Sequence, residues 1–567
     1  MSNFRHKLQI VLTIGTIMLT RGITAAPSSQ DMLQTELDAA IKSGKNKIVL
    51  TQPEYRLTRP VVISNLQNRT IDGNGARIIV TTSTPKRSVG AMIITNQTRD
   101  VTFRNFTIDY DPVPFTQGTV TEVKGQEIHF KLDQGYPVLE SGRIGGCHTH
   151  IFTSDGRFWK KNQRDVYGYV ESRGDGWGYV ESIRPLGNIS PGDRIAIDWR
   201  GRTGAQAIDM HGKTGNLRFE NITILASPGA AFRCYHGEGG DVFRNCRIER
   251  GARLPDMEHE RLLSTVADGI HFGYARKGIT IEGCDFGYMG DDGVNLHGPL
   301  LVVAEFTGER TMNMIAAGKT NKSSLLSRLE PGTKLRMLDP ETYQILGYYT
   351  YRSSRFLPGK QYPESEVRAL HRRMNALWAQ GVHSVFEVTV DEKIKLPQHV
   401  IFDVPAVNCN GYRIVDNNFH DHRARGLRVM ASNGVIENNR FERIKGPAIT
   451  ALAEYANWGE CGWIENLAIR NNIVKECGFQ QNSIEEAKND YAFGAISVCA
   501  QLGNYVRTVP EHRNIIITGN RIENVPFAGI FLLGVKNGRV TDNTLINTAN
   551  AGYAPGVTHF GNSVNQP

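Results

Sequence analysis

Three aspartates mark the stretch of the chain whose residue types and spacing are best suited to chemistry. Asp268 stands between Ala267 and Gly269, and the pair Asp291-Asp292 begins 23 residues later. Crowded carboxylates resist joint ionisation, so one of them tends to keep its proton. Hydrolysis of a glycosidic bond needs a protonated and an ionised carboxyl, one for the leaving oxygen and one for water or direct attack. We therefore predict that Asp268, Asp291 and Asp292 are catalytic.

Polar and aromatic residues near these acids are candidates for substrate binding. His271 and His297 stand beside the aspartates, where each would bind sugar hydroxyls or steady a carboxylate. Arg425 offers a fixed fork of donors to hydroxyls or to a carboxylate. Trp458 and Tyr455 are candidates for stacking on a sugar ring. The structural alternatives are a core histidine, a surface ion pair and the filling of a solenoid edge.

Acidic turns have a second reading, because Asp and Gly are common in calcium loops and in solenoid turns. The position of Asp268 one repeat away, with two histidines close by, favours catalysis over that reading. The sequence has no Gly-x-Ser-x-Gly elbow, no His-Glu-x-x-His pair and no phosphate loop. We predict no metal and no cofactor.

The spacing of the aspartates belongs to a repeat that runs along the chain. Short strand-like stretches end in a polar–x–apolar step, and equivalent positions are 24 residues apart from Ile224 to Ile248 and 22 apart from Phe419 to Phe441. This period of β-rich stretches is typical of one coil of a right-handed parallel β-helix, with coils about 4.8 Å apart. The predicted fold class is therefore all-β, and Asp268 and Asp291 should lie on adjacent coils.

Two further features fit a solenoid. Residues 32–43 have the pattern of an amphipathic helix, which would cover the open end of the apolar core. An asparagine recurs two residues before the apolar position of the repeat and predicts a ladder of amide hydrogen bonds at a turn. Its positions are Asn417, Asn439, Asn472, Asn520 and Asn543.

Two segments lack the repeat and contain alternating strand patterns, such as residues 118–121 and 385–390. We interpret them as two small inserted β-barrels or hairpin domains that wall a functional cleft, with decoration as the alternative. The predicted organisation is a signal peptide (1–26), an N-terminal cap with the first coils (27–111), an inserted subdomain (112–200), coils with the catalytic carboxylates (201–299), a second inserted subdomain (300–400) and the C-terminal coils (401–567).

Composition excludes several classes of protein. Of the 567 residues, 40% are apolar and 22% charged, which argues against wholesale disorder and a polytopic membrane protein. The net charge is +8, or about +5 without the three basic residues of 1–26. This weak excess has no basic run, so we predict no nucleic-acid partner. The eight cysteines are dispersed without Cys-x-x-Cys pairs, which argues against a zinc site and leaves one or two disulfides open.

The first 26 residues have the pattern of an export signal. Basic residues between Arg5 and Lys7 precede an apolar run from Leu8 to Leu19, and small residues follow near Ala26. The apolar run is shorter than a membrane span needs. We predict cleavage, export to the periplasm or the exterior, and no membrane span in the mature chain. An uncleaved anchor is the alternative.

The motifs around the aspartates resemble those of glycoside hydrolase family 110. The run of residues 262–272, the block Asp291-Asp292-Gly293-Val294-Asn295-Leu296-His297-Gly298 and the segment 423–427 are each similar to family motifs. Gly446-Pro447-Ala448-Ile449, followed by Trp458 and Glu460, is similar to a further coil. The similarity covers roughly residues 30–550, in order. Gly293 and Val294 depart from the family's usual residues.

This resemblance implies an exported, exo-acting, inverting α-galactosidase that releases terminal α-1,3-linked galactose from oligo- or polysaccharides. It places the acid and base roles on the three aspartates without dividing them, and it adds Asn295 to the substrate-binding residues. Whether an acid from the second insertion joins, such as Glu330, stays open, as does the oligomeric state. Alternatives are a polygalacturonase-like hydrolase, which should have a Gly-His-Gly that is missing here, a lyase or epimerase, and a non-catalytic carbohydrate-binding solenoid.

Overall fold

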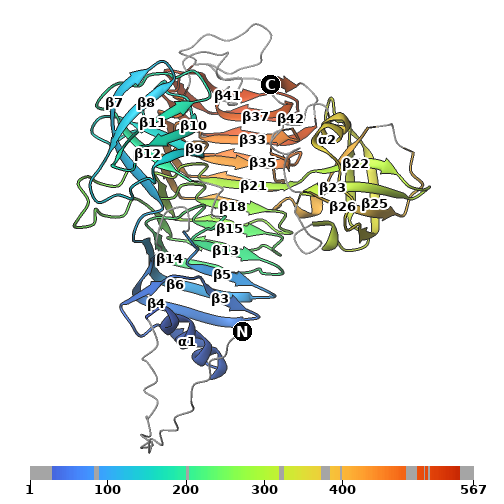
Figure 1. The fold of residues 1–567 in the computed structure, drawn as a ribbon. Coiled ribbons are helices and arrows are strands. Elements are labelled where there is room, and N and C mark those ends of the chain that lie inside the picture. Colours follow the sequence, from blue (N-terminus) through green and yellow to red (C-terminus); the bar gives the residue numbers. More distant parts are fainter. Residues whose placement is uncertain are drawn as a thin grey trace, which may run out of the picture.

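The computed structural model describes residues 29–81, 88–199, 204–317, 325–371, 383–395, 399–456, 458–480, 494–502, 505–507 and 511–548. The predicted signal peptide lies outside these residues. The described chain forms a parallel β-helix that rises from helix α1 (Ser29–Lys42), and two closed barrels lie beside it (Figure 1). The predicted all-β solenoid with two barrel-like insertions is confirmed.

Two faces of the solenoid belong to one sheet, because the long strands β4, β6 and β14 pair across both of them. All strand pairs in this sheet are parallel, as stacked coils require. Its strands are β1 (Lys47–Val49), β2 (Glu54–Leu57), β4 (Gln67–Val80), β6 (Arg99–Tyr110), β14 (Arg218–Ile224), β16 (Val242–Arg244), β17 (Arg247–Ile248), β19 (Thr280–Glu282), β20 (Asp285–Gly287), β28 (Arg413–Val415), β29 (Asn418–His420), β31 (Gly434–Glu437), β32 (Arg440–Glu442), β35 (Glu465–Arg470), β36 (Ile473–Lys475), β39 (His512–Thr518), β40 (Arg521–Glu523), β42 (Val535–Thr541) and β43 (Thr544–Ile546).

The third face is a second sheet, whose strands are stacked along the solenoid in Figure 1. Its parallel strands are β3 (Val61–Ser64), β5 (Met92–Thr95), β13 (Ile208–His211), β15 (Phe232–Tyr235), β18 (Ile270–Gly273), β21 (Val294–Pro299), β30 (Leu427–Val429), β33 (Ile449–Glu454), β37 (Gly494–Leu502) and β41 (Ala528–Leu532). Two short strands pair antiparallel with it, β34 (Glu460–Cys461) on β21 and β38 (Tyr505–Arg507) on β37.

Stacked apolar side chains fill the solenoid. Phe103, Phe219 and Phe243 occupy the same register position on successive coils, and their rings stack at centroid distances of 5.3 and 5.1 Å. Each buried ring removes a large apolar area from water, which is the main favourable contribution to folding. Leu33 and Leu37 of α1 pack against the first coil and belong to the same core. The predicted N-terminal helix thus covers the end of the apolar interior.

The predicted asparagine ladder is present. The Nδ2 atom of each asparagine donates to the Oδ1 atom of the next, at 2.9 to 3.0 Å, so amides that would otherwise be buried without partners satisfy one another. The ladder runs through Asn417, Asn439, Asn472, Asn520 and Asn543.

A second ladder was not predicted. On the exposed surface of the C-terminal coils, the Nδ2 atom of each asparagine donates to the Oδ1 atom of the preceding one at 2.9 to 3.2 Å, through Asn433, Asn466, Asn514 and Asn537. All four residues have positive φ angles between 54° and 57°. Asparagine tolerates this left-handed conformation better than other side chains do, so the ladder marks a sharp turn repeated in each coil.

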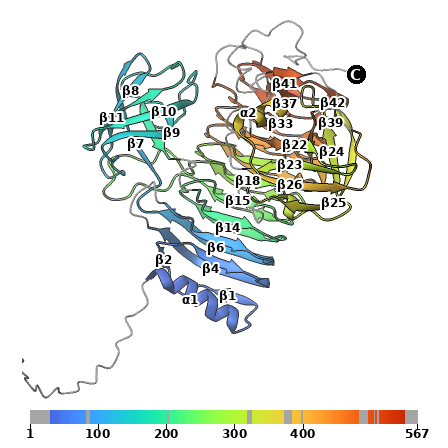
Figure 2. The same ribbon diagram turned by 45° about the vertical axis from the view of Figure 1, so that its right-hand side comes forward.

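The two barrels each close from antiparallel strands. The first barrel contains β7 (Phe115–Lys124), β8 (Glu127–Leu132), β9 (Gly142–Phe152), β10 (Val166–Ser172), β11 (Trp177–Ser182) and β12 (Arg194–Asp198). The second barrel contains β22 (Leu301–Phe306), β23 (Thr311–Ala317), β24 (Lys334–Leu338), β25 (Ile345–Phe356), β26 (His383–Val390) and β27 (Ile401–Asp403), and helix α2 (Glu364–Leu370) packs on it. Figure 2 shows them on different sides of the solenoid.

Two further predictions concern disulfides and membrane-spanning segments. All eight cysteines are buried and free, so the disulfides left open by the sequence are not formed. Among the described residues, no helix combines the length and apolar character needed to cross a membrane.

Candidate active site

The three predicted aspartates meet at one place on the third face. One oxygen of each carboxylate lies within 4.8 Å of the others, and all three side chains are buried. Strands β18 and β21 pair with Ile270 opposite Val294, which brings Asp268 beside Asp292. The partner of Asp268 in register is therefore Asp292 rather than Asp291, because the coil here is 24 residues long and not 23.

Glycines after the aspartates allow this close stacking. A Cβ atom on Gly269 would lie 2.6 Å from the backbone oxygen of Gly293, and one on Gly293 would lie 2.4 Å from that of Gly426. Any larger residue would push the coils apart. The glycines of the Asp-Gly, Asp-Asp-Gly and Arg-Gly motifs thus occupy the same closely packed position on three coils. The ionisable residue before each glycine is therefore aligned with those on the neighbouring coils.

Each carboxylate has its own side-chain partner. Arg423 Nη2 donates to Asp291 Oδ1 at 2.6 Å. The backbone N–H of Arg425 and its Nη2 atom donate to the two oxygens of Asp292, at 2.8 and 2.9 Å. His271 Nδ1 lies 2.5 Å from Asp268 Oδ2, and the N–H of Asp292 donates to Asp268 Oδ1 at 3.1 Å. Arginines already balance the charges of Asp291 and Asp292, which distinguishes the cluster from a cation site.

Two histidines form a hydrogen-bonded chain behind Asp268. Burial lowers the pKa of His297 well below its usual value, so its ring is neutral. Nδ1 of His297 faces the Gly298 carbonyl at 3.1 Å and must carry the proton, which leaves Nε2 as an acceptor. His271 Nε2, 3.1 Å away, is then the donor to it. A single proton remains to be shared between His271 Nδ1 and Asp268 Oδ2.

The neighbouring residues that point out of the solenoid are also polar, although Asn295 and Arg428 are buried. His271, Asn295 and Arg428 occupy the same register position on β18, β21 and β30. Asn295 Nδ2 donates to Glu460 Oε2 at 3.1 Å, and Arg428 bridges Glu460 and Glu454. Among the described residues, Asn295 Oδ1 is a buried oxygen without a hydrogen-bond partner.

The predicted binding residues differ in their access to a ligand. Trp458 is 54% exposed, and its backbone N–H donates to Glu454 Oε1 at 3.0 Å. Arg425 is partly exposed. His297 is only 1% exposed and lies behind His271, so any influence of His297 on a sugar would pass through His271. The stacking role for Tyr455 is wrong, because its ring is fully buried and its hydroxyl donates to Asp403 at 2.6 Å.

Several residues of the site were not predicted to belong to it. Glu460 was noted in the sequence without a role, and Tyr235, whose hydroxyl lies 2.8 Å from His271 Nε2, was not singled out. Tyr235 is in register with Gly273 on the next coil, so coil counting is the signal that would have found it. Glu330 is an exposed side chain whose ion pair is with Arg276, at 3.2 Å.

The distance between the carboxyl groups of a glycosidase is related to whether the reaction inverts or retains the configuration of the sugar. Asp291 and Asp292 each have an oxygen within 4.8 Å of the other, which is closer than the gap of about 6.5–9.5 Å typical of inverting glycosidases. Both are held towards the solenoid by arginines of one coil, Arg423 and Arg425.

The comparison with known proteins supplies evidence on the type of chemistry. No protein-family model matches the chain. The α-1,3-galactosidase B of Bacteroides thetaiotaomicron is 24% identical over 520 residues, which cover 86% of this chain and 75% of that protein. The α-1,3-galactosidase A of Shewanella woodyi is 24% identical over 485 residues, covering 81% and 70%.

The chain is similar to α-1,3-galactosidases. This similarity over most of the chain supports a glycoside hydrolase. Among solved structures, the catalytic domain of an α-1,3-glucanase in complex with tetrasaccharides aligns with 94% of this chain and 66% of its own, at 10% identity and a TM-score of 0.35.

Proposed function

We propose that this protein is an exo-acting glycoside hydrolase that releases terminal α-1,3-linked galactose from glycans with inversion. The observation that carries the proposal is the convergence of Asp268, Asp291 and Asp292 in a chain similar to α-1,3-galactosidases. The motif resemblance to glycoside hydrolase family 110 supports inversion, although the carboxylates lie closer together than is typical of inverting enzymes.

The proposed reaction needs one proton donor and one proton acceptor. A protonated carboxyl gives its proton to the glycosidic oxygen as the bond to C1 breaks, and a carboxylate takes a proton from the water whose oxygen forms the new bond. Asp268 and His271 share a proton between them, and Tyr235 and His297 fix the ring that holds it. Arg425, whose side chain is partly exposed beside Asp292, is placed to orient sugar hydroxyls.

A hydrolysis assay tests the proposal. The mature chain is incubated with α-1,3-linked digalactoside, blood group B trisaccharide and polygalacturonate. Free galactose is expected from the first two, and Asp292→Asn should abolish its release. Asp416→Asn is the matched control, because Asp416 is an exposed acid at a corner of the same solenoid. Reducing ends from polygalacturonate alone would favour the alternative hydrolase.

Stereochemistry and acid–base roles need separate measurements. Proton NMR during turnover should show β-galactose first, whereas α-galactose first would exclude inversion. Loss of the acid should be less damaging on an aryl galactoside, whose leaving group needs no proton, than on the disaccharide. The Asp→Asn variant at each of the three positions, assayed on both substrates, therefore identifies the acid.

We also propose export of the chain, on the pattern of residues 1–26. N-terminal sequencing of the protein recovered from the periplasm or the medium should begin near Pro27. An N-terminus that still contains residues 1–26 would contradict cleavage.

A further inference from the structure

One acidic residue of the first barrel contacts the solenoid next to the active site. Asp165 immediately precedes β10 and is largely buried. It accepts hydrogen bonds from Arg423 Nη1 and, at 3.0 Å, from Lys445 Nζ. These partners are 258 and 280 residues away in the sequence, on two neighbouring coils. Both cations are themselves buried.

Arg423 connects Asp165 to the catalytic cluster. Its three nitrogens have three different acceptors: Nε donates to the Gly290 carbonyl at 2.6 Å, Nη2 to Asp291 Oδ1 at 2.6 Å, and Nη1 to Asp165. A guanidinium is planar, so fixing two of its nitrogens fixes the direction of the third. The orientation of the donor to Asp291 therefore depends on Asp165.

The charges of Asp165, Arg423 and Lys445 make the orientation of Arg423 depend further on Asp165. Burial alone would raise the pKa of Asp165, but Arg423 and Lys445 outweigh burial and hold the pKa well below its usual range. Asp165 is thus an anion between two cations. Without it, Asp291 would be the acidic partner left to Arg423, and Lys445 would lose its carboxylate. Removing one partner of a buried charged group leaves the other uncompensated.

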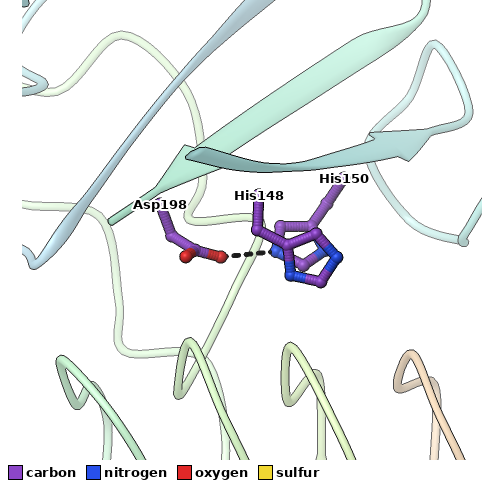
Figure 3. Close-up of side chains that lie close together, drawn as sticks. All are labelled: His148, His150 and Asp198. Atoms are coloured by element: carbon purple, nitrogen blue, oxygen red, sulfur yellow. Dashed lines mark hydrogen bonds and ion pairs between the residues drawn. The ribbon is translucent and has the colours of Figure 1, made fainter. Parts of the chain in front are cut away.

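Apolar side chains of the barrel and the solenoid pack together at the rest of this contact, and a buried polar cluster of the barrel lies beside them. Figure 3 shows His148 and His150 from β9 and Asp198 from β12 on the same side of the barrel, with His150 Nε2 and Asp198 Oδ2 2.7 Å apart. The donor set would suit zinc. Burial lowers the pKa of His150, and the positive charges of Arg423 and Lys445 lower it further, so cations already face this cluster. We interpret it as packing that supports the Asp165 loop.

We propose that Asp165 is a positioning residue of the active site, which orients Arg423 and thereby the Asp291 carboxylate. The proposal rests on the glycosidase function proposed above. Accordingly the site is complete only when the first barrel is docked on the solenoid, and the insertion contributes to turnover rather than only to the shape of the surface.

Asp165→Asn tests the proposal in the full-length chain, since asparagine keeps the shape and removes the charge. The expected result is a fall in kcat of about 10- to 100-fold, the size expected for misplacing a catalytic group, with KM changed less than about threefold. The limb of the pH–rate profile that reports Asp291 should shift. Asp175→Asn, an exposed acid on the same barrel, should leave both constants unchanged.

A double variant shows whether the effect passes through Arg423. If it does, Asp165→Asn combined with Arg423→Gln should lower kcat no more than Arg423→Gln alone. Additive losses would overturn the proposal, as would an Asp165→Asn protein with the parent's kcat and pH profile. Should that variant not fold, Asp165→Glu replaces it, and a kcat within about twofold of the parent's would overturn the proposal. A parent protein inactive on galactosides would instead refute the proposed function.

Discussion

The two barrels share an architecture but join the solenoid in different ways. The second barrel is continuous with a strand of the site, since β22 begins two residues after β21 ends. Its buried ion pair, Arg336 with Asp403, lies between two barrel strands, and Tyr455 of the solenoid donates to the same carboxylate. At the first barrel, by contrast, the acid is on the barrel and both cations are on the solenoid.

Because of this difference, a broken ion pair should affect turnover at only one of the two junctions. A charge pair confined to the second barrel and its junction has no contact with the three aspartates, so breaking it should unfold that region without changing the chemistry. The pair at the first junction ends on Asp291. Breaking it should lower the rate as well as the stability, because buried cations next to Asp291 are left uncompensated. Variants of the two junctions can therefore be compared directly.

The largest effect is expected from Arg336→Met. This change leaves Asp403 buried without its cation, which should lower the free energy of unfolding by about 3–5 kcal/mol. Denaturant unfolding measures it. Arg355→Met is the control, because Arg355 pairs with Glu387 on the surface of the same barrel and should cost about 1 kcal/mol or less. A normal stability with a reduced kcat would contradict the division between the junctions.

The first junction should depend on pH through His420. Burial alone would lower the pKa of His420, but ion pairs with Asp285 and Asp421 raise it to about 9. Its stabilising contribution is therefore complete below about pH 6.5 and is lost as the pH rises through 9. The Asp421 carbonyl accepts from Trp159 of the first barrel at 2.8 Å, which places this pair at the junction.

His420→Gln measures this contribution. Urea unfolding should show the parent more stable than the variant by about 2–3 kcal/mol at pH 6, and the difference should largely disappear by pH 10. A difference that stays constant between these two pH values would mean that the charge on His420 does not stabilise the junction.

The smallest effect is expected from Trp458→Ala. Trp458 is exposed beside Glu454, so removing its ring should raise KM for the galactoside about two- to tenfold and leave stability nearly unchanged. Trp177→Ala on the outer surface of the first barrel is the matched control, because Trp177 has a similar exposure. Equal KM values for the two variants would remove Trp458 from the binding site.

Much of the solenoid could be predicted because its information is local and repeated. A recurring apolar position shows the coil length, and a recurring asparagine shows which side chains stack, as the ladder from Asn417 to Asn543 demonstrates. The same counting brought Asp268 near Asp291 and Asp292. The counting paired Asp268 with Asp291, one residue away from its partner in the structure, because coils vary in length where a turn gains or loses a residue.

The remaining site residues could not be predicted from a period. Asp165 reaches Arg423 across 258 residues, and Glu460 reaches Asn295 across 165, through loops that carry no repeat. Tyr455 shows the opposite error. Its place near Trp458 in the chain suggested a shared role, but the second barrel covers one ring and leaves the other exposed. Which side of a coil an insertion covers depends on tertiary packing, which the local pattern does not encode.

Helix α1 has a consequence for the behaviour of the protein in solution. The first coil presents backbone N–H and C=O groups along its outer edge, and an uncovered edge of this kind is a template for another chain. Leu33 and Leu37 seal the apolar end, and Gln34 bonds to both backbone groups of Val62 on β3. The helix thus blocks end-to-end stacking of solenoids, and a chain shortened past Lys42 should self-associate into fibres.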